Sequence, residues 1–320
     1  MTVAGACVYT LFMLVFGIAF LVDWIRNYQW IRGYLKWGLA IGLTLLGLNI
    51  ATVVIAPVAL GHHVALVLVA DMFIFIRAVG FSMLGMYYCA RLGLPSVRLA
   101  MSSPDETDVH DTDETGPEGE TVPVSDSVEV EGISAESLVE PVPEADSLPV
   151  EDHPQMPLVP EGDARGWVLH VALVVIVSIV YSIVLFKATS PRMSEVAKQA
   201  LGLGGDALAA GETMTPQALL FLLTFAFGEE IFFRLGIQNF LAYRLGWRGN
   251  KYWLAIIVTS GLWTLGHVGM LEPGWVKLAQ IFPLGLVLGW LFKKHGLESA
   301  ICAHGLFNCL LAIPALDLIR

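Results

Sequence analysis

Charged residues are scarce in this sequence, and long apolar runs take their place. Asp, Glu, Lys and Arg make up 15% of the 320 residues, against about 25% in an ordinary soluble domain. Hydrophobic residues make up 56%, and the mean hydropathy is +0.68. This composition excludes a soluble globular enzyme and indicates a polytopic membrane protein.

Cysteine is also rare. The four cysteines stand in or beside apolar stretches, and no two of them have Cys-x-x-Cys spacing. Neither a disulfide scaffold nor a zinc ribbon is supported, so we expect buried free thiols. They are Cys7, Cys89, Cys302 and Cys309.

Three motifs of intramembrane proteases are missing. The sequence contains no Gly-x-Ser-Gly motif of a rhomboid, no His-Glu-x-x-His motif of a metalloprotease and no Gly-x-Gly-Asp motif of an aspartyl protease. Each of these motifs supplies the nucleophile, ligand pair or carboxylate on which its chemistry depends. These three chemistries are therefore unsupported.

Basic residues are absent from one long segment. Residues 99–164 contain 19 Asp and Glu and no Lys or Arg, whereas the rest of the chain holds 10 carboxylates and all 18 basic residues. The segment has no aromatic residue, so it cannot bury enough apolar surface to offset the entropy lost on folding. We expect residues 99–165 to form a disordered acidic linker, with a docking tail for a basic partner as the alternative.

Eight apolar stretches are long enough to cross a bilayer as helices, which takes about 17–25 residues each. Their unbroken apolar runs differ from the alternating pattern of barrel strands. The sequence predicts an all-α polytopic membrane protein with a three-helix N-terminal block, residues 1–98, and a five-helix block, residues 166–320. The stretches are 4–23, 37–60, 64–90, 166–188, 215–241, 252–270, 275–292 and 297–316.

Lys and Arg are divided unevenly between the two sets of loops. Eleven stand in the set that includes the ends of the acidic linker, and five stand in the other set. Because basic residues favour cytoplasmic loops, we expect the linker to be cytoplasmic and the protein to be integral to the plasma membrane.

Two charged residues, Asp71 and Arg77, stand in the third apolar stretch. They are six residues apart and therefore face different sides of a helix. We expect neighbouring helices, or snorkelling to the membrane surface, to satisfy them.

Polar and ionisable side chains in the C-terminal apolar stretches are the main functional signal. A charge in the middle of a membrane helix costs at least about 2–3 kcal/mol, so such residues usually line a cavity and carry function. The i,i+4 spacing places Glu230 and Arg234 on one helix face, whereas Glu229 points about 100° away. We therefore expect only Glu229, and not Glu230, to face His267 and His304. The whole set, typical of a hydrolytic site, is Glu229, Glu230, Arg234, His267, His304 and Asn308.

Counting from the stretch ends places His267 near one membrane face and His304 near the other. For both histidines to meet Glu229, at least one span must be tilted, broken or re-entrant, which is tolerated where the backbone lines a cavity. The residues that favour such a break are Gly266, Gly269, Pro273 and Gly274.

Three short motifs carry a resemblance to a known family. GEEIFFR at 228–234, WTLGH at 263–267 and HGLFN at 304–308 resemble the EExxxR, FxxxH and HxxxN motifs of the CPBP family. These are the CAAX proteases and bacteriocin-processing enzymes, also called the ABI family, related to type II CAAX prenyl endopeptidases. Trp263 stands where the family usually has Phe.

The resemblance implies an intramembrane endopeptidase that cleaves a membrane-associated or lipidated peptide and has no nucleic-acid partner. Glu229 and His267 would activate a water molecule. His304 and Asn308 would stabilise the oxyanion that forms on the scissile carbonyl.

The Glu230–Arg234 pair would fix the rotamer of the neighbouring Glu229. No cofactor is expected, since an amide beside His304 suits an oxyanion role better than a ligand shell. Zinc is the alternative, with Glu229, His267 and His304 as its three ligands.

Two functions of other classes stay open. One is a non-catalytic membrane scaffold or bacteriocin-immunity-like protein that keeps the polar cluster for stability. The other is a transporter with a proton relay, although no pair of matching interrupted helices marks an inverted repeat.

Overall fold

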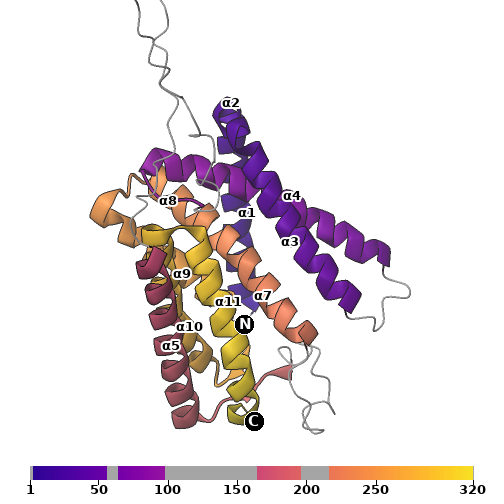
Figure 1. Ribbon diagram of the computed structural model, residues 1–320, viewed down its shortest axis with the longest axis vertical. Coiled ribbons are helices and arrows are strands. Elements are labelled where there is room, and N and C mark those ends of the chain that lie inside the picture. The colour runs from indigo at the N-terminus through magenta and orange to yellow at the C-terminus, as the bar shows by residue number, and fades with distance from the viewer. Residues whose placement is uncertain (1–2, 56–63, 98–163, 196–215, 320) are drawn as a thin grey trace, which may run out of the picture. The chain divides into compact units, whose positions relative to one another are not determined.

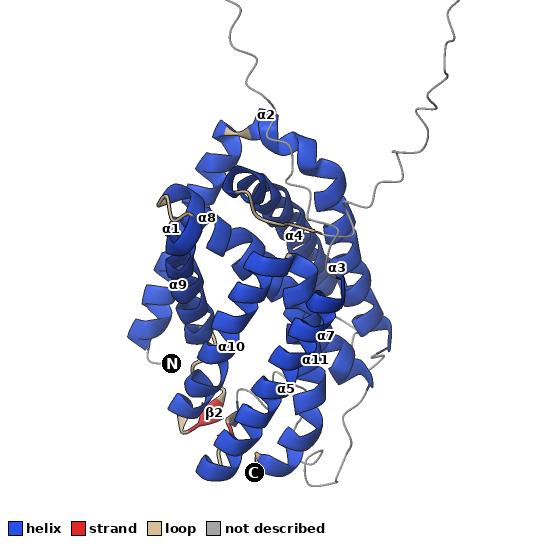
Figure 2. Ribbon diagram, turned by 60° about the vertical axis from the view of Figure 1, so that its left-hand side comes forward, coloured by secondary structure: helices blue, strands red, loops and turns tan. Residues whose placement is uncertain are grey.

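A computed structural model describes residues 3–55, 64–97, 164–195 and 216–319, which are helical apart from short turns and one two-stranded ribbon (Figures 1 and 2). The chain is an all-α membrane protein, as its composition predicts. Within the described residues, five helical segments are long and apolar enough to cross a membrane. They are Tyr28–Thr52, Ala70–Leu92, Gly166–Thr189, Gly274–His295 and Leu297–Pro314.

The helices before the predicted linker begin with a long apolar one. They are α1 (Val3–Arg26), α2 (Tyr28–Ile31), the 3-10 turn η1 (Arg32–Tyr34), α3 (Leu35–Ile55) and α4 (Val64–Leu92). The linker itself, 99–165, lies almost wholly outside the described residues, so its predicted disorder stays a prediction. The side chain of Cys7 is likewise outside them, and Cys89, Cys302 and Cys309 are free thiols.

The helices after the linker include one irregular segment. They are α5 (Ala164–Thr189), α7 (Pro216–Glu230), the π-helix η2 (Ile231–Gln238), α8 (Asn239–Arg244), the 3-10 turn η3 (Gly249–Lys251), α9 (Tyr252–Leu265), α10 (Gly274–His295) and α11 (Leu297–Leu318). Within the described residues each of the eight predicted stretches overlaps a helix, although 215–241 runs through α7, η2 and α8, and 252–270 continues past the end of α9 at Leu265. The number of them that span the bilayer stays a prediction.

Helices from both sides of the linker pack against the continuous run of α7, η2 and α8. Helix α3 contacts α7, α4 contacts η2 and α8, and α11 contacts both α7 and η2. Two glycines allow these close approaches, because a Cβ on Gly85 would lie 2.5 Å from the carbonyl oxygen of Leu235, and one on Gly305 would lie 2.6 Å from Leu223. Small residues serve the same purpose in many membrane helix pairs.

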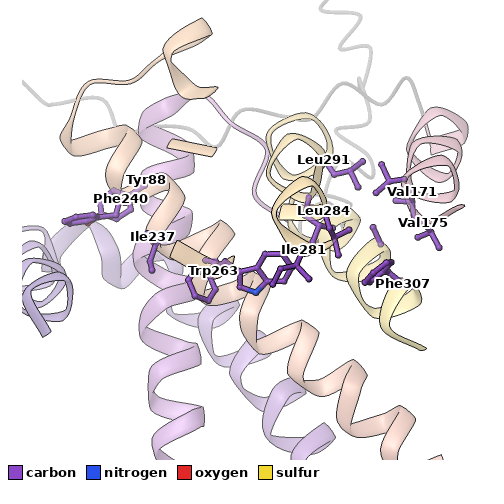
Figure 3. Close-up of a cluster of buried hydrophobic side chains, with 14 of the residues drawn as sticks. Tyr88, Val171, Val175, Ile237, Phe240, Trp263, Ile281, Leu284, Leu291 and Phe307 are labelled. Carbon is purple, nitrogen blue, oxygen red and sulfur yellow. The ribbon is translucent and has the colours of Figure 1, made fainter. Parts of the chain in front are cut away.

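Helices from both sides of the linker therefore belong to one packed unit. The division into blocks 1–98 and 166–320 remains a prediction about domains. Figure 3 shows part of the shared core, where Trp263 of α9 lies near Ile281 of α10, and Val175 of α5 lies near Phe307 of α11.

A buried carboxylate connects α1 with the end of α8. Asp23 forms an ion pair with Arg244 and accepts a hydrogen bond of 2.7 Å from the hydroxyl of Tyr88 on α4. Buried charges require such partners. This contact fixes the first helix to α4 and α8.

The chain breaks where the glycines and proline predict it. Helix α9 ends at Leu265, and a turn follows before β2 (Leu271–Glu272) pairs antiparallel with β1 (Arg192–Met193). Helix α10 then begins at Gly274. His267 thus lies in the turn after α9 rather than on a helix. Its depth is therefore not fixed by a straight membrane-spanning helix, as counting from the stretch ends had assumed.

Candidate active site

Glu229 stands at the centre of the polar cluster, on the last turn of α7. Its Oε1 lies 3.8 Å from Nε2 of His267, and its Oε2 lies 3.8 Å from Nε2 of His304. The Glu229 side chain is 14% exposed, and those of His267 and His304 are 16% and 3% exposed. Three residues from three separate predicted stretches therefore converge in a nearly buried site.

The other nitrogen of each histidine is engaged away from Glu229. Nδ1 of His267 is 3.0 Å from the carbonyl oxygen of Trp263, and Nδ1 of His304 is 2.8 Å from Oε1 of Glu230. A carbonyl oxygen and an ionised carboxylate only accept hydrogen bonds, so each Nδ1 carries the hydrogen. In the neutral form of either ring, the lone pair of Nε2 therefore faces Glu229.

Glu230 and Arg234 form a buried ion pair beside this site. Nε of Arg234 lies 3.2 Å from Oε2 of Glu230, and the two side chains are 0% and 1% exposed. The Arg234 guanidinium also lies over the ring of Trp263, 5.2 Å from its centroid. The pairing predicted from the i,i+4 spacing is present in the structure.

One prediction about the two glutamates is wrong. The 100° angle between them led us to expect that only Glu229 would face His304, yet Glu230 binds it at 2.8 Å. The reason is that an imidazole ring has nitrogens on two edges. His304 lies between the carboxylates and presents Nδ1 to Glu230 and Nε2 to Glu229.

Trp263 is a site residue that the motif comparison treated as a minor departure. Its indole Nε1–H donates to Oε2 of Glu229 at 3.0 Å, and its ring meets those of His267 and His304 edge-on at centroid distances of 5.2 and 5.3 Å. Only 2% of the residue is exposed. A buried indole N–H requires an acceptor. A Trp inside an apolar stretch was therefore the sequence signal that could have identified this contact.

Asn308 lies one turn beyond His304 on α11 and is partly buried. Within the described residues, no hydrogen bond joins its side chain to Glu229 or to either histidine. Its predicted oxyanion role therefore stays a prediction.

The backbone widens directly after the two glutamates. Residues Ile231–Gln238 form a π-helix, in which hydrogen bonds run from i to i+5, and nearly all of it is buried. Such turns are rare and frequently occur at functional sites. The π-helix carries Arg234, so its wider turn determines where the guanidinium contacts Glu230 and Trp263.

The arrangement of these donors bears on zinc. In the described part of the chain, no group of three or more His, Cys, Asp and Glu side chains is arranged to hold a metal ion. The Nε2 atoms of His267 and His304, which face Glu229, have the chemistry of metal ligands. Their positions in the structure do not form a three-ligand metal site with Glu229.

A cavity of about 310 Å³ is lined in part by Glu229. Its polar lining comes from Asn49 on α3, Arg77 on α4, and Thr224 and Glu229 on α7. The rest is apolar, contributed by α3, α4, α7 and η2. Glu229 therefore lies near both histidines and also lines a chamber large enough for a small ligand.

The comparison with protein families agrees with the motifs. Residues 211–310 match the Rce1-like family, described as type II CAAX prenyl endopeptidase Rce1-like. All three motifs lie inside this segment, about a third of the chain, so the resemblance read from them is confirmed. The family is one of proteases, which supports a peptidase activity. No curated protein and no solved structure matches the chain.

Proposed function

We propose that this protein is an intramembrane endopeptidase that hydrolyses a peptide bond of a membrane-associated or lipidated substrate. The observation that carries the proposal is the convergence of Glu229, His267 and His304, with both Nε2 atoms 3.8 Å from the carboxylate. The Glu229 carboxylate and Nε2 of neutral His267 are both acceptors, and they repel at this distance unless they share a donor. A water molecule has two O–H groups and can donate to both.

The water bound between Glu229 and His267 is the proposed nucleophile. Glu229 accepts one proton from it, while Nε2 of His267 accepts a hydrogen bond from the other O–H and orients the oxygen. Proton transfer to a positioned base of this kind contributes about 10²–10⁴-fold to the rate. The resulting hydroxide attacks the scissile carbonyl carbon, and Glu229 then returns the proton to the leaving amine.

Negative charge develops on the carbonyl oxygen as the water adds. With a hydrogen on both ring nitrogens, His304 donates through Nδ1 to Glu230 and through Nε2 to this oxyanion. The amide of Asn308, one turn away, is the second proposed donor. Donors held in a dry site contribute about 3–4 kcal/mol each to stabilising the transition state.

Trp263 and the Glu230–Arg234 pair position these groups. The indole N–H holds Oε2 of Glu229, which leaves Oε1 toward His267 and the water. Glu230 orients His304, and Arg234 neutralises Glu230. Catalytic groups held by a second layer of hydrogen bonds lose less entropy during the reaction.

The proposal requires no metal. Zinc remains the alternative, with Glu229, His267 and His304 as ligands, and it would supply a water of lowered pKa. We further propose that the protein resides in the plasma membrane with its linker in the cytoplasm, where the bias of basic residues places it.

The test compares a peptide ending in a farnesylated CAAX sequence with the same peptide lacking the farnesyl group. Purified wild-type protein in lipid nanodiscs should cleave the lipidated peptide, and Glu229→Gln should abolish cleavage. Cleavage by both proteins would contradict the catalytic assignment. Absence of cleavage by either, with both correctly folded, would favour the non-catalytic scaffold.

A further inference from the structure

We infer that the cavity between α3, α4 and α7 receives the C-terminal end of the substrate, and that Arg77 binds its terminal carboxylate. The inference rests on the proposed peptidase function and adds a specificity residue to it. This residue comes from the N-terminal helices, outside the segment 211–310 that matches the protease family.

Arg77 lies in an unusual position for an arginine. It lies inside the apolar segment Ala70–Leu92, where an arginine is costly unless it faces a cavity or a partner. Its guanidinium lies over the ring of Phe232, 5.5 Å from the centroid, and it lines the cavity together with Glu229. The charge is therefore directed to the chamber beside the catalytic carboxylate.

Arg77 has no counter-charge of its own among the described residues. The two other arginines discussed above are both neutralised, Arg234 by Glu230 and Arg244 by Asp23. No carboxylate in the described part of the chain forms an ion pair with Arg77, and the residue is exposed. Its N–H groups are available to a ligand.

The lining of the chamber suits a carboxylate at the end of an apolar peptide. A guanidinium stacked on an aromatic ring keeps its in-plane N–H donors free, and their fork matches a carboxylate in two parallel hydrogen bonds. Asn49 and Thr224 add hydrogen-bonding groups. The apolar remainder of the wall suits aliphatic side chains, so the cavity matches an apolar peptide with one negative end.

The length of a CAAX C-terminus is consistent with this binding mode. In a CAAX sequence the lipidated cysteine is followed by three residues, which span about 10–11 Å when extended. If Arg77 holds the terminal carboxylate, the bond after the cysteine lies about 10–11 Å or less from the guanidinium. Glu229 lines the same cavity of about 310 Å³, which places the water-activating group within that segment's reach.

The test uses two farnesylated peptides that differ only at the C-terminus, one with a free carboxylate and one with an amide. Wild type, Arg77→Gln and Arg77→Lys are compared in phosphatidylcholine nanodiscs, with Arg248→Gln as the control because Arg248 is exposed and does not line the cavity. Wild type should have a KM on the order of 10- to 100-fold lower for the carboxylate peptide than for the amide. Arg77→Gln should lose this preference, Arg77→Lys should keep part of it, and Arg248→Gln should keep all of it.

Binding measured in the Glu229→Gln background separates this inference from the proposed function. Fluorescence anisotropy of the two peptides reports the preference without turnover, so it decides the role of Arg77 even if the wild type cleaves nothing. Equal binding of the two peptides, or a preference that survives Arg77→Gln at unchanged Tm, would overturn the inference. So would an Arg77 effect that appears only when phosphatidylglycerol replaces phosphatidylcholine, since the ligand would then be a lipid phosphate.

Discussion

Replacing Glu230 with Gln should destabilise the protein far more than the same change at the adjacent Glu229. The Glu230 side chain is 1% exposed and lies 3.2 Å from Nε of Arg234 and 2.8 Å from Nδ1 of His304. Gln can still accept from His304, but it leaves a fully buried guanidinium without a counter-charge. Removing one partner of such a pair costs about 3–5 kcal/mol.

Glu229 is in a different position. Its side chain is 14% exposed, and its hydrogen bond from the indole of Trp263 can be accepted equally by the amide oxygen of Gln. The expected loss is below about 1 kcal/mol. At roughly 2–4 °C per kcal/mol for a chain of this size, Glu230→Gln should lower Tm by about 6–20 °C and Glu229→Gln by less than about 4 °C.

Activity should follow the opposite order. Glu229→Gln removes the proposed base and should reduce kcat by about 10²–10⁴-fold, whereas Glu230→Gln should keep residual turnover at temperatures below its Tm. Differential scanning fluorimetry in one detergent and peptide cleavage at a fixed temperature measure both quantities. Glu272→Gln, at an exposed position, is the matched control. A wild-type Tm for Glu230→Gln would refute the buried-pair argument, and near wild-type cleavage by Glu229→Gln would refute the assignment of the base.

Three further changes test other parts of the site and chain. Trp263→Phe keeps the ring but removes the donor to Glu229, so kcat should fall about tenfold, the value of one hydrogen bond of about 1.4 kcal/mol, with little change in KM; an unchanged kcat would exclude Trp263 from positioning. Treatment with a strong chelator should leave cleavage intact, and a loss that zinc alone restores would make His267 and His304 ligands. Deletion of 100–163 with a short flexible spacer should leave cleavage largely unchanged in nanodiscs, and complete loss in a correctly inserted, stable protein would show that the linker takes part in the chemistry.

The sequence by itself determined the class of protein and the identity of the polar cluster. Apolar run length and the cost of unsatisfied backbone groups in lipid leave helices as the solution, and within the described residues each of the eight predicted stretches is largely helical. The intrahelical pair Glu230–Arg234 followed from spacing alone, because residues four apart share a face. The break after α9 followed from its glycines and proline.

Only the tertiary structure decided how the cluster is assembled. Helical periodicity states which side chains share a face of one helix, but the rotation and depth of a helix relative to its neighbours depend on packing between distant segments. For that reason the sequence could not show that His304 lies between both glutamates, or that Trp263 donates to Glu229. Nor could it show that Arg77, on a helix before the linker, shares a cavity with Glu229. That contact exists because α3 and α4 pack against α7 and η2, an outcome of side-chain shape that no local pattern encodes.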